Sequence, residues 1–399
     1  MNPRCENATL VAGPIESQAK SEEMSMRCFY VLSGMILVLS VGAVAETYVV
    51  DPDGSGDFPT IQAAVNASVD GDTIELTPGT FTGDGNRDID YLGKAITIRS
   101  KSGNPGVCTI DCQGGEDDPH RGFQFQSGEG AGAVLESTTI TNGYALRGGG
   151  VFCESSDPTI SDCIFSGNSS EDGGGLFCMH SAPTITDCVF LGNSAHSDEG
   201  LGGGISCWYS SFPTIANCLF SENTADYRGG AIHSGWSFPT LVECMFTENS
   251  AAHHGGMYAI GSHPSLTNCT FYHNTYVMGL YDYSNAILEN CLVAFNWGNI
   301  PFYCHEHSSA TLTCCDVFGN SGGDWLGCIS DQYGINGNIC EDPLFCAPEE
   351  GDLYLHKESP CAPFTVPNPE CDLIGGLPVN CGGTPTTSSS WGAVKAVFR

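Results

Sequence analysis

Positive charge is scarce in this 399-residue sequence, which has 13 Lys and Arg residues against 46 Asp and Glu residues. Between Gly122 and His356 the basic side chains, histidine apart, are Arg147 and Arg228. Nucleic acids and anionic membranes are bound through Lys and Arg that neutralise phosphate, so neither is expected as a partner. The formal net charge of −33 also disfavours a polyanionic polysaccharide, unless cations bridge the two.

The sequence also lacks the spacings of common metal sites. The 22 cysteines contain no two CxxC pairs, which argues against structural zinc. Two Asp-rich runs, 51–57 and 84–90, have neither the Gly at position six nor the closing Glu of an EF-hand. We therefore expect no metal or other cofactor, and a weak structural Ca²⁺ at these turns is the alternative that stays open.

Long apolar runs are rare, and the clearest one lies near the N-terminus. Met26-Arg27-Cys28 precedes an apolar stretch from Phe29 to Val44, and Ala43-Val44-Ala45 has the pattern of a cleavage site. These features predict a secretory signal peptide cleaved after Ala45 and therefore a secreted or cell-surface protein. The mature chain would contain no transmembrane segment and 20 cysteines.

A repeated pair of residues dominates the rest of the chain. Seven times an Asn follows a Cys by five residues, and the unit recurs every 22–30 residues. A constant inner spacing with variable lengths between units is typical of a solenoid. A further pair, Ser137 and Asn142, has Ser in place of Cys. The pairs are Cys163 with Asn168, Cys188 with Asn193, Cys218 with Asn223, Cys244 with Asn249, Cys269 with Asn274, Cys291 with Asn296, and Cys315 with Asn320.

The repeats predict an all-β chain, specifically a right-handed, single-stranded parallel β-helix with three short strands per turn. In one unit, alternation places Ile160, Cys163, Phe165, Leu176 and Cys178 toward the interior. Asn tolerates the corner conformation and can hydrogen-bond both the local backbone and the Asn of the next turn. Cys in the adjoining ladder acts as a small buried hydrophobe, although disulfides between turns remain an alternative.

Five regions follow from the pattern. Residues 1–45 are an N-terminal extension with the signal peptide, and 46–130 form the N-terminal cap, with a short helix after Thr60, and the first turns. Residues 131–320 are the repeats, 321–381 an irregular, Cys-rich C-terminal cap, and 382–399 a Ser/Thr linker and tail. The cysteines expected to form disulfides lie outside the ladder: Cys328, Cys340, Cys346, Cys361, Cys371 and Cys381.

Two sets of motifs carry a family resemblance. The segment from Asp53 to Ala64 (DGSGDFPTIQAA) resembles the start of the pectin lyase-like superfamily. The repeats carry Phe-x-x-Asn, as at 165–168, and Gly-Gly-Ala-Ile at 229–232, which are similar to repeats of polymorphic outer-membrane proteins. More broadly, residues 47–381 resemble secreted bacterial β-helix repeat proteins. The resemblance implies the fold but no single activity, because this superfamily includes lyases, hydrolases, esterases and adhesins.

The signature blocks of the enzyme families are missing. Pectin methylesterases carry Gln-Asp-Thr-Leu and Leu-Gly-Arg-Pro-Trp, and polygalacturonases carry Gly-His-Gly and Arg-Ile-Lys; this chain has none of them. Pectate lyases use basic residues over clustered Asp, and this chain has few basic residues. These departures favour a structural or binding role, adhesin-like or glycan-binding, over an enzyme of the superfamily.

The residues between the repeated pairs vary, and functional candidates lie there. Trp208, Tyr209 and Trp236 occur on neighbouring turns and would either stack sugar rings or cover a loop. The candidates for acid–base catalysis or a metal site are Asp226, Arg228, His233 and His254, and a solvated ridge is the alternative.

We therefore predict an exported β-helix protein that binds a neutral glycan or a partner protein, most simply as a monomer. The alternative is a polysaccharide lyase or glycoside hydrolase with its site on the face from Trp208 to His254. The residue types suit both functions, because aromatic rings bind sugars in either case and only an acid–base pair distinguishes catalysis.

Overall fold

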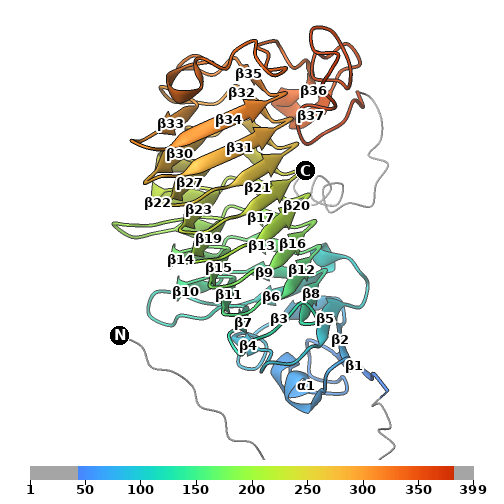
Figure 1. Cartoon of the computed structure of the whole chain (residues 1–399). Coiled ribbons are helices and arrows are strands. Elements are labelled where there is room, and N and C mark those ends of the chain that lie inside the picture. Colours follow the sequence, from blue (N-terminus) through green and yellow to red (C-terminus); the bar gives the residue numbers. More distant parts are fainter. Residues whose placement is uncertain (1–43, 382–399) are drawn as a thin grey trace, which may run out of the picture. The chain divides into compact units, whose positions relative to one another are not determined.

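The computed structural model describes residues 44–381, which form a parallel β-helix of about eleven turns (Figure 1). A turn passes in order through an eleven-stranded sheet, a ten-stranded sheet and a nine-stranded sheet, and strands of successive turns pair in parallel. Ile160, Ile185 and Ile215, for example, are partners in three consecutive turns. The predicted fold class is confirmed. The N-terminal extension, the signal peptide and the C-terminal tail lie outside the described residues.

The eleven-stranded sheet comprises β1 (Thr47–Val50), β2 (Thr73–Leu76), β5 (Thr97–Ser100), β8 (Val134–Glu136), β12 (Thr159–Ser161), β16 (Thr184–Thr186), β20 (Thr214–Ala216), β24 (Thr240–Val242), β28 (Ser265–Thr267), β31 (Asn285–Glu289) and β34 (Ser309–Thr313). The ten-stranded sheet comprises β3 (Gly79–Phe81), β6 (Cys108–Asp111), β9 (Thr139–Thr141), β13 (Ile164–Ser166), β17 (Val189–Leu191), β21 (Leu219–Ser221), β25 (Met245–Thr247), β29 (Thr270–Tyr272), β32 (Leu292–Ala294) and β35 (Asp316–Phe318). The nine-stranded sheet comprises β4 (Ile89–Asp90), β7 (Phe123–Phe125), β11 (Val151–Glu154), β15 (Leu176–Met179), β19 (Ile205–Trp208), β23 (Ile232–Gly235), β27 (Met257–Ile260), β30 (Met278–Tyr281) and β33 (Phe302–Cys304).

The middle turns contain a fourth strand that the repeat pattern did not predict. It follows the Asn corner and forms a five-stranded sheet. Its inward positions carry small side chains, among them Ala145, Ser170, Ala195 and Ala225, which are buried. These strands are only two to five residues long, too short for alternation to stand out in a variable loop. The strands are β10 (Tyr144–Arg147), β14 (Ser169–Asp172), β18 (Ser194–Ala195), β22 (Thr224–Arg228) and β26 (Ser250–His253).

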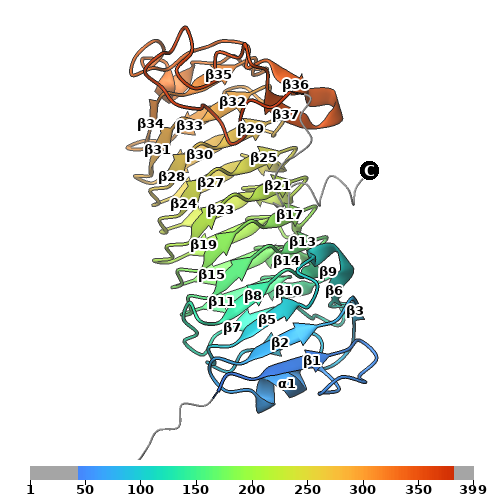
Figure 2. The same ribbon diagram turned by 90° about the vertical axis from the view of Figure 1, so that its right-hand side faces the viewer.

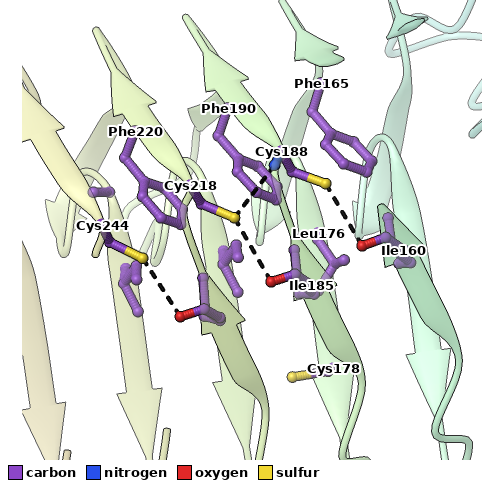
Figure 3. Packing of buried hydrophobic residues seen from close by; sticks show 14 of the residues in the cluster. Ile160, Phe165, Leu176, Cys178, Ile185, Cys188, Phe190, Cys218, Phe220 and Cys244 are labelled. Atoms are coloured by element: carbon purple, nitrogen blue, oxygen red, sulfur yellow. Dashed lines mark hydrogen bonds between the residues drawn. The ribbon is translucent and has the colours of Figure 1, made fainter. Parts of the chain in front are cut away.

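Ladders of identical side chains fill the interior. The rings of Phe165, Phe190 and Phe220 lie almost parallel, with centroids 4.7 and 4.9 Å apart (Figure 3). Beside them the seven ladder cysteines are buried free thiols. The Cys188 thiol donates to the Ile160 carbonyl of the preceding turn at 3.7 Å (Figure 3). Each buried ring contributes roughly 1.5–3 kcal/mol to stability.

The asparagines form a second ladder at the corner after the ten-stranded sheet. The Asn223 amide nitrogen donates to the Phe190 carbonyl at 2.8 Å and to the Asn249 side-chain oxygen at 2.9 Å. The Asn223 oxygen accepts from the backbone and the side-chain amides of Asn193, at 3.1 and 3.0 Å. The corner backbone is thereby satisfied without water, because each buried amide uses both its donor and its acceptor. The same bonding runs from Asn168 to Asn320.

Asn274 and Asn296 continue this ladder toward the C-terminal end, and both are buried. The Asn274 amide nitrogen donates to the Phe246 carbonyl at 2.8 Å and to the Asn296 side-chain oxygen at 3.1 Å. The Asn296 amide nitrogen donates to the Phe271 carbonyl at 2.9 Å and to the Asn320 side-chain oxygen at 3.0 Å. In addition, each of the two donates to the carbonyl two residues earlier in its own turn, at 3.2 and 3.1 Å. Their sequence assignment to the ladder therefore agrees with their hydrogen bonds.

Asn142 does not belong to this ladder, so its assignment is corrected. Ile164 pairs with Thr139, which places Gly143, not Asn142, opposite Asn168, and Thr138 opposite Cys163. The Gly143 amide donates to the Asn168 side chain at 2.9 Å, and the ladder ends there. Asn142 is exposed and bonds Asp111 instead. The five-residue spacing from Ser137 to Asn142 is a coincidence, because each residue lies one position before the corresponding ladder position.

Both ends of the solenoid are covered (Figure 2). Helix α1 (Ile61–Ala67) packs beneath the first turn through buried Ile61, Ala64 and Val65, and the Thr60 hydroxyl caps it by accepting from the Ala63 amide. At the other end lies a cap with an antiparallel pair of strands. This cap contains β36 (Phe345–Ala347), β37 (Asp352–Leu355) and the 3-10 helices η2 (Gly327–Ile329) and η3 (Pro348–Glu350). A further 3-10 helix, η1 (Pro105–Val107), lies in the N-terminal part of the solenoid.

Three disulfides hold the C-terminal cap: Cys304–Cys328, Cys314–Cys371 and Cys346–Cys381. Four of the six cysteines expected to form disulfides are therefore bridged. Cys340 and Cys361 are not, because each thiol instead hydrogen-bonds a carboxylate, of Asp324 and Asp316 respectively. Within residues 44–381, no helix has the length and apolar character needed to cross a membrane.

Candidate functional site

The outward side chains of the nine-stranded sheet form the face on which most candidate residues meet. Strand alternation and parallel register place one outward side chain from each turn in a single row along this face. A second row contains Met179, Trp208 and Tyr281, two residues further along each strand. The first row is Phe152, Phe177, Ser206, His233, Tyr258, Gly279 and Tyr303.

Charged side chains at one border of the sheet lean over this row. The guanidinium carbons of Arg121, Arg147 and Arg228 lie 4.8, 5.3 and 4.6 Å from the ring centroids of Phe152, Phe177 and Tyr258. In each case the ring belongs to the turn that follows the arginine. Arginines stack readily on aromatic faces.

Several rings on this face lie where the next turn has a glycine. A Cβ atom on Gly235 would come within 2.6 Å of the Trp208 ring, and one on Gly261 within 2.6 Å of the Trp236 ring. Similarly, a Cβ on Gly279 would meet the His254 ring at 2.2 Å. The missing side chains therefore allow these rings to lie across the sheet.

A cleft of about 380 Å³ opens on the N-terminal half of the face. Burial raises the pKa of the Asp172 carboxyl to about 6, against hydrogen bonds from Ser206 and Trp208 and the charge of Arg147, which lower it. The Trp208 indole donates to Asp172 at 2.7 Å. A carboxyl of this kind can be protonated near neutral pH and can act as a general acid. The cleft is lined by Arg147, Glu171, Asp172, Glu199, Trp208 and Tyr209, among others.

A second cleft of about 330 Å³ lies toward the C-terminal end of the face. His254 forms part of its wall, with its ring centroid 6.1 Å from Tyr281 and 6.0 Å from Tyr303. Burial, with the charges of His253 and Arg228, lowers the His254 pKa to about 4, so the imidazole is neutral at pH 7. Its Nδ1 is buried and has no hydrogen-bond partner. The remaining lining residues are His253, Tyr276, Asn299 and Ile300.

An aromatic surface begins in the wall of the first cleft, at Trp208 and Tyr209, and continues to Trp236 on the next turn toward the second cleft. Tyr209 and Trp236, 48% and 44% exposed, are nearly parallel with centroids 5.6 Å apart. Trp208 lies 5.7 Å from Trp236. Parallel rings at this distance are offset, so part of each face is left open to a ligand.

His233 does not have the expected solvent-facing position. Its side chain points outward from the sheet, but Trp208 and Tyr258 of the adjoining turns cover it, at 4.7 and 5.7 Å, and it is 1% exposed. Burial lowers its pKa to about 3. Its Nδ1 hydrogen-bonds the Ser206 hydroxyl at 3.0 Å. His233 therefore packs beneath the surface as a neutral imidazole.

The structure brings Trp208, Tyr209, Trp236, Arg228 and His254 onto one face but leaves Asp226 apart. Asp226 lies on β22, exposed, and faces His196, the residue after β18, at 3.3 Å. A register shift in β22 between Ala225 and Arg228 breaks the regular alternation, so Asp226 and Arg228 do not continue one row.

Four residues of the face were not predicted: Asp172, Tyr258, Tyr281 and Tyr303. One signal for Asp172 was available, since it occupies the position before the Gly pair that Arg147 and Arg228 hold in other turns. Tyr258, Tyr281 and Tyr303 occupy outward positions in strands of the nine-stranded sheet. An outward position in the sequence does not show which side chains contact one another.

The sequence left open a weak structural Ca²⁺ at the two Asp-rich turns, 51–57 and 84–90. No group of three or more His, Cys, Asp or Glu side chains within 44–381 is arranged to hold a metal ion. In the two Asp-rich turns the carboxylates have local partners, since Asp57 accepts from the Val49 amide and Asp84 pairs with Arg87 at 3.0 Å.

The fold and this face define a β-helical solenoid with two clefts and an aromatic outer surface that extends from one of them toward the other. Residues 86–220 and 214–340 match the family described as "Right handed beta helix region", so the chain belongs to that family. No significant sequence match was found among curated proteins.

Solved structures to which this chain shows some similarity include a pectate lyase, a pectin methylesterase and a rhamnogalacturonan lyase. The pectate lyase Pel9A is 14% identical, with a TM-score of 0.47 over 85% of this chain and 98% of the lyase. Pectin methylesterase from carrot is 12% identical (TM-score 0.38; 76% and 90% covered). Rhamnogalacturonan lyase is 13% identical (TM-score 0.34; 83% and 96% covered). Likeness at these values does not define the activity of this chain.

Proposed function

We propose that the outer face of the nine-stranded sheet binds a carbohydrate chain and that the protein works outside the cell. The observation that supports binding is the aromatic surface of Trp208, Tyr209 and Trp236, which extends from one cleft toward a second. Sugar rings have apolar faces that pack on aromatic side chains, while polar groups in adjoining clefts bind the hydroxyls. The parallel ladder would offer a chain-like ligand similar contacts from turn to turn.

The cap supports an extracellular location. Its three disulfides are typical of proteins that fold in an oxidising compartment. The secretory signal predicted from the sequence lies outside the described residues and agrees with this location. We include in this proposal that the repeats are related to those of bacterial surface proteins.

Replacing Trp236 by asparagine is expected to weaken binding of a neutral oligosaccharide about tenfold or more. The substitution removes an exposed ring, and loss of about 1.5 kcal/mol of contact corresponds to this factor. Asparagine suits the left-handed backbone at this position (φ 47°). Isothermal titration against a panel of oligosaccharides measures the change.

Tyr283→Asn is the matched control, because Tyr283 is also an exposed ring with positive φ (64°) and stacks on His307. Tyr283 is not among the residues that line either cleft. Equal affinity of the Trp236→Asn variant and the parent protein for every bound sugar would rule out the aromatic surface as the binding site.

A second candidate function, hydrolysis of the bound chain, is favoured by Asp172. A carboxyl with a pKa of about 6 can protonate the oxygen of a leaving sugar, while a second carboxylate takes a proton from the attacking water. Glu171 and Glu199 line the same cleft and are the candidates for that second group.

If the protein hydrolyses its ligand, Asp172→Asn should lower kcat by about 100-fold or more, since an amide cannot donate the proton. The parent activity should fall as the pH rises through about 6, because the acid form is the active one. Reducing-sugar release as a function of pH measures both effects. Glu154→Gln, on the sheet but outside the cleft, is the control. Undiminished turnover in Asp172→Asn would exclude this role.

A further inference from the structure

Arg228 is a cation that has no carboxylate partner in a strongly acidic protein. The described residues contain six ion pairs, and none includes Arg228. Its Nε is buried and has no hydrogen-bond partner. Arg228 is half-buried, and holding a charge there without a counter-charge is costly, although the chain has 46 acidic residues. The missing partner therefore suggests that an external anion completes the site.

Tyrosines hold the guanidinium in place. Arg228 lies over the rings of Tyr227, Tyr258 and Tyr281, with distances of 4.1, 4.6 and 5.5 Å to their centroids. One terminal nitrogen donates to the Tyr258 hydroxyl at 2.7 Å. These contacts restrict the side chain without neutralising it, so its orientation is set before a ligand arrives.

The cleft of about 330 Å³ adjoins this cation through a shared wall. Tyr281 both contacts Arg228 and lines the cleft. His254, 7% exposed, lies against both Tyr258 and Tyr281 and has an unsatisfied Nδ1. Two buried polar atoms without partners, Arg228 Nε and His254 Nδ1, therefore lie next to the same tyrosines.

We propose that Arg228 and the adjoining cleft bind a single carboxylate group carried by an otherwise neutral glycan. The inference rests on the proposed carbohydrate binding and specifies the ligand further. A guanidinium matches a carboxylate through two parallel hydrogen bonds, and surrounding aromatic rings accommodate the sugar that bears it. His254 is neutral at pH 7, so the site offers one positive charge and suits a monoanion.

The charge distribution explains why one carboxylate fits better than many. Among the described residues of this face, the next arginine before Arg228 is Arg147, whose ring partner Phe177 lies three turns from Tyr258. The chain as a whole is strongly acidic, with a formal net charge of −33. A chain charged at every sugar would be repelled outside the Arg228 site, whereas an isolated acidic group would not.

Three probes test this directly: a neutral xylo-oligosaccharide, the same oligosaccharide with one glucuronic acid side group, and an oligogalacturonate charged at every residue. The singly charged probe is expected to bind at least about tenfold more tightly than the other two, and the gain should shrink at high salt. Arg228→Gln should abolish the gain and leave affinity for the neutral probe within about twofold. Arg121→Gln removes a guanidinium stacked in the same way on Phe152, four turns away, and should preserve it.

A direct measurement on the parent protein covers the case in which no oligosaccharide binds or Arg228→Gln does not fold. The Nε–H NMR signal of Arg228 should shift on titration with glucuronate and not with glucose. Absence of that shift overturns the anion site. A gain that survives Arg228→Gln, or tightest binding of oligogalacturonate, overturns the proposal equally. A shift without any oligosaccharide binding would support the anion site while excluding the proposed carbohydrate surface.

Discussion

Replacing Asn223 by alanine is expected to lower the free energy of unfolding by about 3–5 kcal/mol. The change leaves two buried donors of Asn193 and the Phe190 carbonyl without the partners that the Asn223 side chain supplies. Asn223 is fully buried, so water cannot replace these hydrogen bonds without opening the corner. Guanidinium-induced unfolding followed by tryptophan fluorescence measures the loss.

Asn142→Gly is the control for the corner ladder. Asn142 fits the Ser/Cys-to-Asn spacing in the sequence, but it is exposed and one position out of register. Glycine avoids strain at its left-handed backbone (φ 53°). We expect a change within about 0.5 kcal/mol for this surface position. If Asn223→Ala were as mild as Asn142→Gly, the ladder would not be the stabilising element that its hydrogen bonds indicate.

Asp316→Asn should remove a large pH dependence of stability where the last strand of the ten-stranded sheet meets the C-terminal cap. Asp316 is 0% exposed and occupies the position at which the preceding turn has Leu292. Burial raises the pKa of its carboxyl from 3.8 to about 7, against hydrogen bonds from Cys361 and the Glu341 amide, which lower it. The protonated acid is therefore the form that the folded cap prefers.

The sign follows from proton linkage. The folded protein binds this proton more tightly than the unfolded chain, so the stabilisation is complete below about pH 4 and is lost as the pH rises through about 7. The difference between the folded and unfolded pKa values of Asp316 corresponds to a loss on the order of 4 kcal/mol in the free energy of unfolding. Unfolding curves between pH 4 and 8 should show this decline in the parent protein and not in Asp316→Asn.

The exposed cap residue Asp331 provides the comparison. Asp331→Asn should leave the decline between pH 4 and 8 unchanged, because its carboxyl is in water in both states. The difference between the parent protein and each variant isolates the contribution of one carboxyl. If the parent and Asp316→Asn change equally in stability between pH 4 and pH 8, the Asp316 carboxyl does not have the raised pKa.

The sequence predicted the corner ladder from Asn168 through Asn274 and Asn296 to Asn320, because each pair lies within one turn and repeats at a nearly constant period. The prediction failed at Asn142, where Gly143 and Thr138 occupy the ladder positions and an adjacent Asn imitates the spacing. It also missed the five-stranded sheet, whose strands pair over few residues. Local spacing is informative only where the same residue types recur.

The functional face was predicted in part. Trp208 and Trp236 stand out at the spacing of one turn, and they do meet, 5.7 Å apart. Asp172 and Trp208 are 36 residues apart, and no spacing in the sequence joins them, although a hydrogen bond does. His233 was assigned to the surface because its outward position is visible in the sequence, whereas the rings that cover it come from the turns on either side.

What the sequence alone determined is the solenoid: inward alternation and the recurring Asn corner specify which side chains stack, because both depend on residues close together in the chain. The tertiary structure decided which outward side chains form a site. Arg228 reaches the ring of the following turn, and Trp208 and His254 lie where Gly235 and Gly279 leave space. Such contacts depend on how side chains lean between turns, and only the stacked turns bring them together.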